Sequence, residues 1–172
     1  MRYFIIPAIV VVLLTLMCCT PHANQDLRNP ENEALAVKFT DALLKPDFEV
    51  IEGFLSDDYK EYGPAAKDSV DRATSLANWR KGWEEEYSSM TYDRYGTLST
   101  TVPKGRVAGD WVLDWGKWTI NYKDGRPSVT IWFHAALRMK DGKINRQRNF
   151  YDTGDIMGQQ GFSFVPPYDE GK

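Results

Sequence analysis

The chain has 172 residues, a length that suits one domain preceded by a short targeting segment. Apolar residues make up 42% of the sequence and charged residues 26%, which is enough to bury a core and excludes an intrinsically disordered chain. The formal net charge is −3, from 21 basic and 24 acidic residues with no basic run, so a nucleic-acid-binding protein is excluded as well.

Residues 1–18 are predicted to form an export signal. After a positively charged start, the run Tyr3–Met17 is apolar but too short for a membrane span of about 20 residues. The cysteines that follow resemble the lipidation site of a bacterial lipoprotein signal, with Cys19 as the favoured lipid anchor and Cys18 as the alternative. We therefore expect an exported lipoprotein of the bacterial cell envelope, tethered to a membrane; an uncleaved anchor helix is the other interpretation.

Cysteine and histidine are almost absent from the predicted domain. Both cysteines lie in the signal, so disulfides, thiolate metal sites and cysteine nucleophiles are excluded from the domain. His22 falls in a polar tether at residues 19–29, which leaves His134 alone in the fold. Because no two-histidine site and no cofactor motif occur, we expect neither a metal ion nor another cofactor.

Three helices are predicted in the first half of the domain, which we place at residues 30–161 and which precedes a tail at 162–172. Asn29-Pro30 is typical of a helix start, and Lys45-Pro46 ends this first helix. The second helix covers Asp47–Leu55, and the third covers residues 68–88 after an extended piece at Tyr59–Gly63.

Four strands are predicted after Met90, where the apolar pattern changes to a period of two. They cover about 91–102, 111–122, 128–140 and 143–152. Asp124-Gly125 and Asp141-Gly142 are typical of tight hairpin turns between the last three strands. Helices followed by hairpins predict an α+β fold, with the helices packed on one face of a mainly antiparallel sheet.

Two-residue turns also fix which residues face each other across the sheet. Three rows are then predicted on the inner face: Trp118–Ile131–Asp152, Gly116–Phe133–Phe150 and Asp114–Ala135–Arg148. In the last row, the Arg148 guanidinium would reach Asp114 across the methyl group of Ala135. This pair is either a satisfied ion pair or a site where Arg148 holds an anionic ligand that Asp114 positions.

Asp152 is the predicted general acid or base. Its row would surround the carboxyl with apolar side chains, which raises a carboxyl pKa and suits proton transfer, with Arg148 as electrostatic support. A cap on the turn at Thr153-Gly154 is the alternative. Trp83 and Trp118 are predicted to be walls of a ligand pocket, and Phe133 and Phe150 lie on the same predicted face.

The opposite sheet face is predicted to be rich in aromatic residues. An aromatic face of this kind is rarely left in water, so we expect a partner subunit, and hence a homodimer, to cover it. The residues concerned are Trp111, Trp115, Trp132, His134 and Tyr151.

The segment Met139–Gly161 resembles the closing motif of SnoaL-like proteins, which belong to the nuclear transport factor 2-like (NTF2-like) superfamily. The resemblance lies in Lys140-Asp141-Gly142-Lys143-Ile144, Phe150-Tyr151-Asp152 and Gly154-Asp155-Ile156-Met157-Gly158-Gln159-Gln160-Gly161. It implies a curved sheet wrapped around helices to form a conical pocket, commonly in a dimer. In the polyketide-cyclase branch the aspartate of this motif is the acid/base, and it falls on Asp152.

The sequence departs from the related ketosteroid isomerases at both catalytic carboxylates. Their acidic oxyanion donor would fall on Ala135, and their catalytic carboxylate would fall near Gly63, with Tyr62 and Glu61 as neighbours. The resemblance therefore does not imply steroid isomerisation. We also expect Tyr62 to contact the ligand.

Three functions remain open on the sequence. The first is an envelope-tethered protein that binds a small, partly aromatic or anionic molecule in the conical pocket. The second is a cofactor-independent cyclase, isomerase or dehydratase that uses Asp152. The third is a homodimeric scaffold or assembly module of the cell envelope.

Overall fold

The computed structural model describes residues 28–163, in which four α-helices, one π-helix and six strands occur. The helices are α2 (Pro30–Leu43), α3 (Phe48–Phe54), α4 (Arg72–Lys81), the π-helix η1 (Gly82–Glu86) and α5 (Thr153–Gln159). The strands are β1 (Leu55–Tyr62), β2 (Val70–Asp71), β3 (Tyr87–Val102), β4 (Gly109–Tyr122), β5 (Val129–Lys140) and β6 (Lys143–Phe150). The predicted export signal, both cysteines and most of the tether and tail lie outside the described residues. Within residues 28–163, no helix has the length and apolar character needed to cross a membrane.

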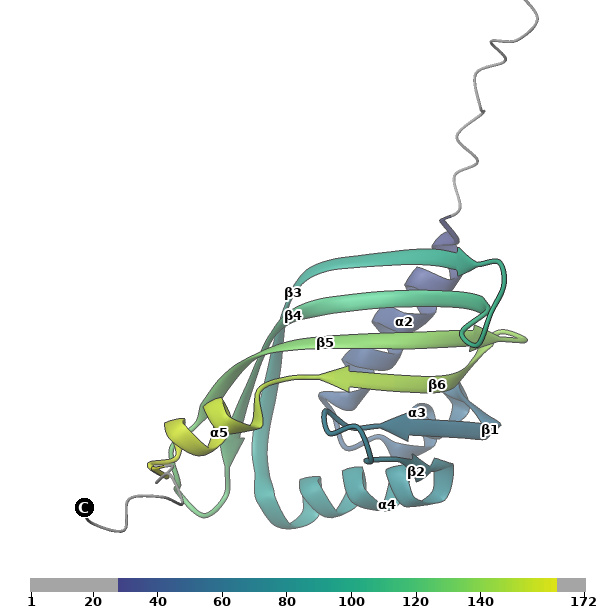
Figure 1. The fold of residues 1–172 in the computed structure, drawn as a ribbon. Coiled ribbons are helices and arrows are strands. Elements are labelled where there is room, and N and C mark those ends of the chain that lie inside the picture. Colours follow the sequence, from purple (N-terminus) through teal and green to yellow (C-terminus); the bar gives the residue numbers. More distant parts are fainter. Residues whose placement is uncertain (1–27, 164–172) are drawn as a thin grey trace, which may run out of the picture.

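The six strands form one curved sheet in the order β2-β1-β6-β5-β4-β3. Neighbouring strands are antiparallel except β1 and β6, which run parallel. Figure 1 shows α2 and α3 against one face of the sheet, and β3, β4 and β5 bending at one end toward α4 and α5. The predicted α+β fold, with N-terminal helices on the concave face of a mainly antiparallel sheet, is confirmed.

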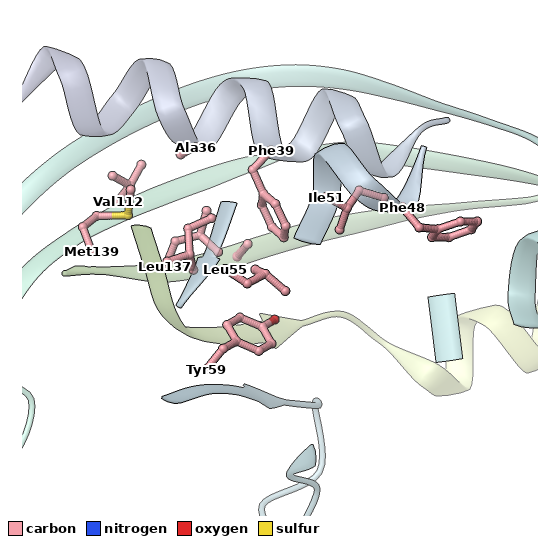
Figure 2. Packing of buried hydrophobic residues seen from close by; sticks show 11 residues of the cluster. Ala36, Phe39, Phe48, Ile51, Leu55, Tyr59, Val112, Leu137 and Met139 are labelled. Carbon is pink, nitrogen blue, oxygen red and sulfur yellow. The ribbon is translucent and has the colours of Figure 1, made fainter. Parts of the chain in front are cut away.

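The hydrophobic core lies between the first two helices and the sheet (Figure 2). Phe39 of α2, Ile51 of α3 and Leu137 of β5 are at most 1% exposed. Burial of a large apolar side chain contributes about 1.5–3 kcal/mol, so this cluster fixes the helices on the sheet. The ring of Phe39 also meets the edge of Trp79 at 6.0 Å between centroids, which joins α4 to the same core.

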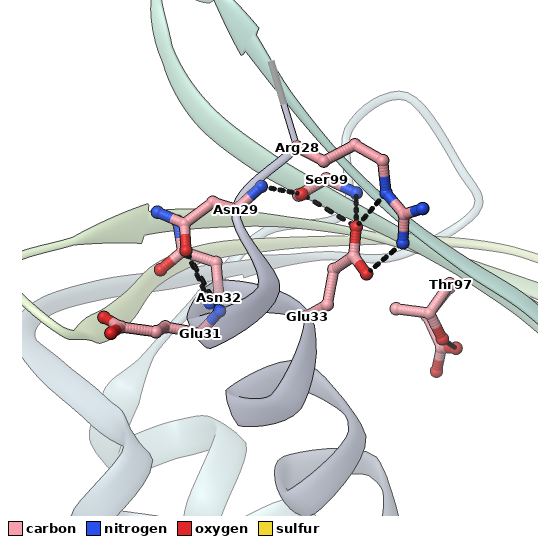
Figure 3. Close-up of polar contacts among 8 residues, drawn as sticks. Arg28, Asn29, Glu31, Asn32, Glu33, Thr97 and Ser99 are labelled. Carbon is pink, nitrogen blue, oxygen red and sulfur yellow. Dashed lines mark hydrogen bonds and ion pairs between the residues drawn. The ribbon is translucent and has the colours of Figure 1, made fainter. Parts of the chain in front are cut away.

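The N-terminus of α2 is attached to β3 by a polar cluster (Figure 3). Asn29 accepts hydrogen bonds from the backbone N–H groups of Glu31 and Asn32, as a helix-capping residue does. The Glu33 carboxylate accepts hydrogen bonds from Ser99 of β3 and from the Arg28 guanidinium. These hydrogen bonds hold the pKa of Glu33 at about 2, well below its ordinary value.

The middle of β3 and β4 contains a close backbone approach. The register of β3 shifts between Arg94 and Gly96, and Gly116 of β4 lies opposite Arg94. A Cβ atom at Gly116 would come within 2.2 Å of the Asp93 carbonyl oxygen, so no larger residue fits. The bulge and Gly116 lie in the interior of β3 and β4, two long strands that bend along their length (Figure 1).

The β4–β5 register agrees with the prediction: Asp114 faces Ala135, Gly116 faces Phe133 and Trp118 faces Ile131. The β5–β6 turn also agrees, since Met139 faces Ile144 and both turn residues have the positive φ angles of a tight hairpin, 52° at Asp141 and 72° at Gly142.

A β-bulge at Asn145 then changes the face of every later residue in β6. Ile144 and Asn145 are consecutive and both buried, and the ladder resumes one residue out of step, with Arg146 opposite Arg138 and Asn149 opposite Ala135. One extra residue reverses the alternation of a strand. The predicted rows that placed Phe150, Arg148 and Asp152 on the inner face are therefore wrong.

Other element boundaries differ from the prediction at residues that later form the site. The third helix ends at Lys81 and continues as η1, so β3 begins at Tyr87 rather than near residue 91. The predicted extended piece belongs to a longer strand, β1. Helix α5 was not predicted, and it begins where the Asp152 carboxylate accepts hydrogen bonds from two backbone N–H groups.

Candidate ligand pocket

A cavity of about 570 Å³ opens between the bent end of the sheet and the helices α4, η1 and α5. Its polar end is formed by side chains of β1 and β6, and its aromatic walls come from α4, η1, β3, β4 and β5. Ile156 and Gln160, in and just after α5, line it as well. This volume falls in the range of small-molecule sites, which are concave and mostly apolar.

Aromatic rings form most of the cavity wall. Trp118 and Phe133 meet edge to face at 5.0 Å between centroids, and Phe133 stacks on Tyr151 at 6.2 Å with an interplanar angle of 25°. Trp83 meets Tyr87 at 6.4 Å. Rings that contact one another in this way lose little freedom on binding and present flat, polarisable surfaces to a ligand.

The π-helix η1 positions Trp83. The indole N–H of this residue donates to the Leu43 carbonyl oxygen at the end of α2. The Lys123 ammonium donates to the carbonyl oxygens of Trp83 and Glu84, at 2.7 and 2.8 Å. Carbonyl groups near a helix end have no partner inside the helix, and a cation satisfies them. Two separate contacts thus fix the backbone and the ring of Trp83.

A chain of four side chains forms the polar end of the cavity. The Tyr59 hydroxyl donates to Gln147 Oε1 at 2.9 Å, Gln147 Nε2 donates to Asn149 Oδ1 at 2.8 Å, and Asn149 Nδ2 donates to Glu61 Oε1 at 2.9 Å. Tyr59, Gln147 and Asn149 are buried, and the bulge at Asn145 is what turns the two amides inward. The chain fixes the Glu61 carboxyl at the cavity surface.

Glu61 has the electrostatic character of an acid–base group. Burial raises the pKa of its carboxyl above the ordinary value, and the nearby Ser75 hydroxyl and the Asn149 amide offset only part of this effect. Burial and then the nearby Glu61 and Asp68 carboxylates raise the pKa of Tyr151. Burial also raises the pKa of Tyr87, to about 12. These phenols are therefore neutral near pH 7, while Glu61 can hold or release a proton.

The structure places three predicted ligand contacts on the cavity wall: Trp83, Trp118 and Phe133. That they bind a ligand stays a prediction. Glu61 was not predicted as a site residue, although it was noted beside the position of the isomerase carboxylate. Gln147 and Asn149 were missed altogether, since the predicted register turned them outward.

Asp114 is buried away from the cavity, in a polar cluster beneath α2. Its carboxylate accepts hydrogen bonds from Thr40 and Thr97 and forms an ion pair with Arg94 at 3.1 Å. It is 0% exposed and does not line the cavity, so its expected place in the pocket is wrong. A satisfied ion pair with Arg148 was one of the two interpretations of Asp114; Asp114 does form an ion pair, but its partner is Arg94 of β3.

Arg148, Asp152, Phe150 and Tyr62 lie outside the cavity lining as well. Arg148 is exposed, and its guanidinium lies over the Tyr62 ring at 5.0 Å from the centroid. Asp152 is exposed and caps α5, which was the alternative interpretation. Phe150 is 48% exposed on the outer face. The bulge at Asn145 accounts for the displacement of the two β6 residues, and the aspartate follows them out of the inner face.

The outer sheet face carries the expected tryptophans. Trp132 is 57% exposed and Trp115 is 37% exposed, and His134 lies between the rings of Trp115 and Phe150. Trp111 shares the face with Trp115 by strand alternation. Tyr151 is a correction: it lines the cavity and stacks on Phe133 instead.

No group of three or more histidine, cysteine or acidic side chains suited to a metal ion occurs in residues 28–163. The groups of the cavity that could act on a ligand are its aromatic surfaces, its amides and the Glu61 carboxyl.

The SnoaL-like domain model matches residues 36–147, which include the bulge in β6 and most of the cavity wall. The chain belongs to the SnoaL-like domain family. None of the curated protein sequences matches it.

Solved structures of other proteins share this fold. A LEH-like epoxide hydrolase from M. tuberculosis is 17% identical, with a TM-score of 0.60 over 76% of this chain and 90% of that chain. An NTF2-like protein of unknown function from Burkholderia pseudomallei is 13% identical, with a TM-score of 0.60 over 77% and 98%. A protein with a ketosteroid isomerase-like fold from Catenulispora acidiphila, in complex with trimethylamine, is 15% identical, with a TM-score of 0.55 over 77% and 97%. Identities this low carry over the NTF2-like fold and nothing finer.

Proposed function

We propose that this SnoaL-like domain binds a small organic molecule with an aromatic or apolar body, which Glu61 and Asn149 orient through one polar group. The observation that carries this proposal is the polar chain that ends at Glu61 inside a cavity walled by aromatic rings. Buried polar groups with fixed partners recognise a matching ligand group well, because a ligand without that group leaves them unpaired.

The expectation of an anionic ligand is no longer supported. That expectation depended on Arg148, which lies outside the cavity. Arg126 is the one basic side chain of the described residues that lines the cavity, and it already pairs with Glu86 at 3.2 Å and Asp124 at 3.3 Å.

Binding is tested by tryptophan fluorescence, since Trp79, Trp83 and Trp118 all line the cavity. A library of small aromatic and alicyclic molecules is titrated into the protein and into Trp83→Leu. A ligand of this cavity changes the emission of the wild type and loses affinity in the variant. A library that leaves the emission and the melting temperature unchanged contradicts the proposal.

An acid–base enzyme is the second candidate, and the raised pKa of Glu61 favours it. In this case Glu61 moves a proton on the bound molecule in an isomerase, cyclase or dehydratase step. Glu61→Gln keeps an acceptor for Asn149 but cannot transfer a proton. Turnover on a screened panel would be lost in Glu61→Gln and kept in Asp152→Asn; the reverse pattern would exclude Glu61 as the acid–base group.

We further propose a membrane tether and a homodimer. Export and lipidation at Cys19 rest on the sequence alone, and the mass of the mature N-terminus tests them. A homodimer through the outer face rests on the exposure of Trp132 and Phe150. Light scattering would show a dimer for the wild type and a monomer for Trp132→Glu; a monomeric wild type would contradict this assembly and the scaffold function with it.

A further inference from the structure

The charged residues that line the cavity are predominantly acidic. Within the described part of the chain they are Glu61, Asp68, Glu86 and Arg126. Arg126 pairs with Glu86 and with Asp124 outside the lining, so its charge is already matched. No lysine or arginine of residues 28–163 forms an ion pair with Glu61 or Asp68 in this structure.

The aromatic walls have the electrostatic character that attracts cations. The face of an indole or phenol ring carries negative potential and attracts a cation placed over it. The protein already uses this interaction at the cavity edge, where the Arg126 guanidinium lies 4.0 Å from the centroid of the Tyr122 ring. Trp83, Trp118 and Tyr151 present further rings to the same cavity.

We propose that the cavity selects organic ammonium cations, with Glu61 as the counter-ion and the aromatic walls as the cage. This inference rests on the proposed small-molecule function and names the ligand class of the same site. A cation in this position would pair the carboxylate that has no basic partner and would lie against ring faces rather than water. An anion would instead meet the Glu61 and Asp68 carboxylates, neither of which forms an ion pair with a basic side chain of the described residues.

The surroundings of Glu61 agree with a missing counter-ion. The Asn149 amide donates to one oxygen of the carboxylate and the Ser75 hydroxyl lies nearby, but neither group neutralises the charge. Removing a carboxylate from water is costly unless an opposite charge accompanies it. Burial accordingly raises the Glu61 pKa, and a bound cation would lower it again.

Three probes of matched shape test the charge preference: choline, its neutral carbon isostere 3,3-dimethylbutan-1-ol, and the anion 3,3-dimethylbutanoate. Each is titrated into the 15N-labelled protein, and dissociation constants are taken from the indole N–H signals of the cavity tryptophans. We expect choline to bind on the order of tenfold more tightly than the alcohol, and the anion to bind least. The wild-type comparison stands even if a variant fails to fold.

Glu61→Gln removes the charge and keeps an acceptor for Asn149. We expect it to weaken choline about tenfold and to leave the alcohol within about twofold, since only the cation loses a charge interaction. Glu49→Gln, which removes an exposed carboxylate on α3, is the matched control and should change neither affinity.

The outcomes separate a failure of the cation preference from a failure of the binding pocket itself. If the alcohol or the anion binds as tightly as choline, the cation preference is wrong while the binding pocket stands. The cation preference is also wrong if indole, added as a neutral aromatic probe, binds and choline does not. If no probe shifts any cavity tryptophan signal, indole included, the proposed function itself fails. An unchanged choline affinity in Glu61→Gln excludes Glu61 as the counter-ion.

Discussion

Gln147→Leu is the substitution that most directly perturbs the polar chain of the cavity. Gln147 accepts a hydrogen bond from the Tyr59 hydroxyl and donates one to Asn149. Leucine is similar in size but offers neither group. The Tyr59 hydroxyl and Asn149 Oδ1 would both lose a partner at buried positions, because Tyr59 is 1% exposed and Asn149 is 7% exposed.

The expected loss of stability follows from those two groups. An orphaned buried polar group costs about 1–3 kcal/mol, so the two groups orphaned in Gln147→Leu should lower the free energy of unfolding by about 2–6 kcal/mol. Tyr59→Phe removes one of the orphaned groups. The double variant should therefore be more stable than the sum of the two single effects predicts, by about 1–2 kcal/mol.

Urea unfolding followed by tryptophan fluorescence measures these free energies. Arg146→Leu is the matched control, since this neighbouring side chain is exposed on the opposite face of β6 and should change stability by less than about 0.5 kcal/mol. If Gln147→Leu behaves like the control, or if the two single effects simply add, the inward placement of Gln147 is wrong.

Three further predictions concern the frame around the cavity. Asp114→Ala should lower the free energy of unfolding by about 3 kcal/mol, which is the lower end of the range for a broken buried ion pair, because the Arg94 side chain is 23% exposed. A loss below about 1 kcal/mol in urea melts would contradict the pairing. Gly116→Ala should lower the melting temperature by several degrees because a backbone carbonyl fills the space of the new Cβ atom, and an unchanged thermal melt would argue against that close approach. The pKa of Glu33 is lowered to about 2, so the stability that its carboxylate contributes is fully present above the pKa of the unfolded state and disappears as the pH falls toward 2. In calorimetric scans, Glu33→Gln should therefore be less stable than the wild type at pH 7 and equally stable near pH 2. A difference in stability that does not change with pH would exclude this linkage.

Local turn chemistry explains why much of the sheet was predictable. Asp141-Gly142 adopts the positive φ angles that such a pair favours, and the β4–β5 register follows from the Asp124-Gly125 turn residue by residue. The helix start at Asn29-Pro30 was equally local, because a capping side chain and a proline act within one turn.

The bulge at Asn145 was not predictable from turn chemistry, and it displaced the predicted site. A signal for it was nevertheless present in β6, where Arg146 and Arg148 alternate with Gln147 and Asn149. Burial of two arginines costs more than burial of two amides, so this alternation favours the register that the structure has. The symmetry of a two-residue hairpin predicts the opposite register, because turn geometry carries no information about this desolvation cost.

Glu61 could not be assigned to the cavity from local pattern alone. Its strand pairs in parallel with β6, across a long separation in sequence, and the pairing itself shifts between Leu55 and Lys60. The inward direction of Glu61 therefore depends on irregularities in both strands. Sequence spacing therefore predicts the fold class and the aromatic walls better than it predicts Glu61, the charged group on which the proposed chemistry depends.

The ionisation of Glu61 is the most direct test of a desolvated carboxyl among aromatic rings. Carbon-detected NMR of the Glu61 side-chain carboxyl, followed across a pH titration of the folded protein, gives its pKa without reference to any ligand. We expect a midpoint above the ordinary value of a glutamate carboxyl, with the signal assigned by its loss in Glu61→Gln. A midpoint at or below the ordinary value would mean that water reaches the carboxyl freely, and the pocket described above would be wrong.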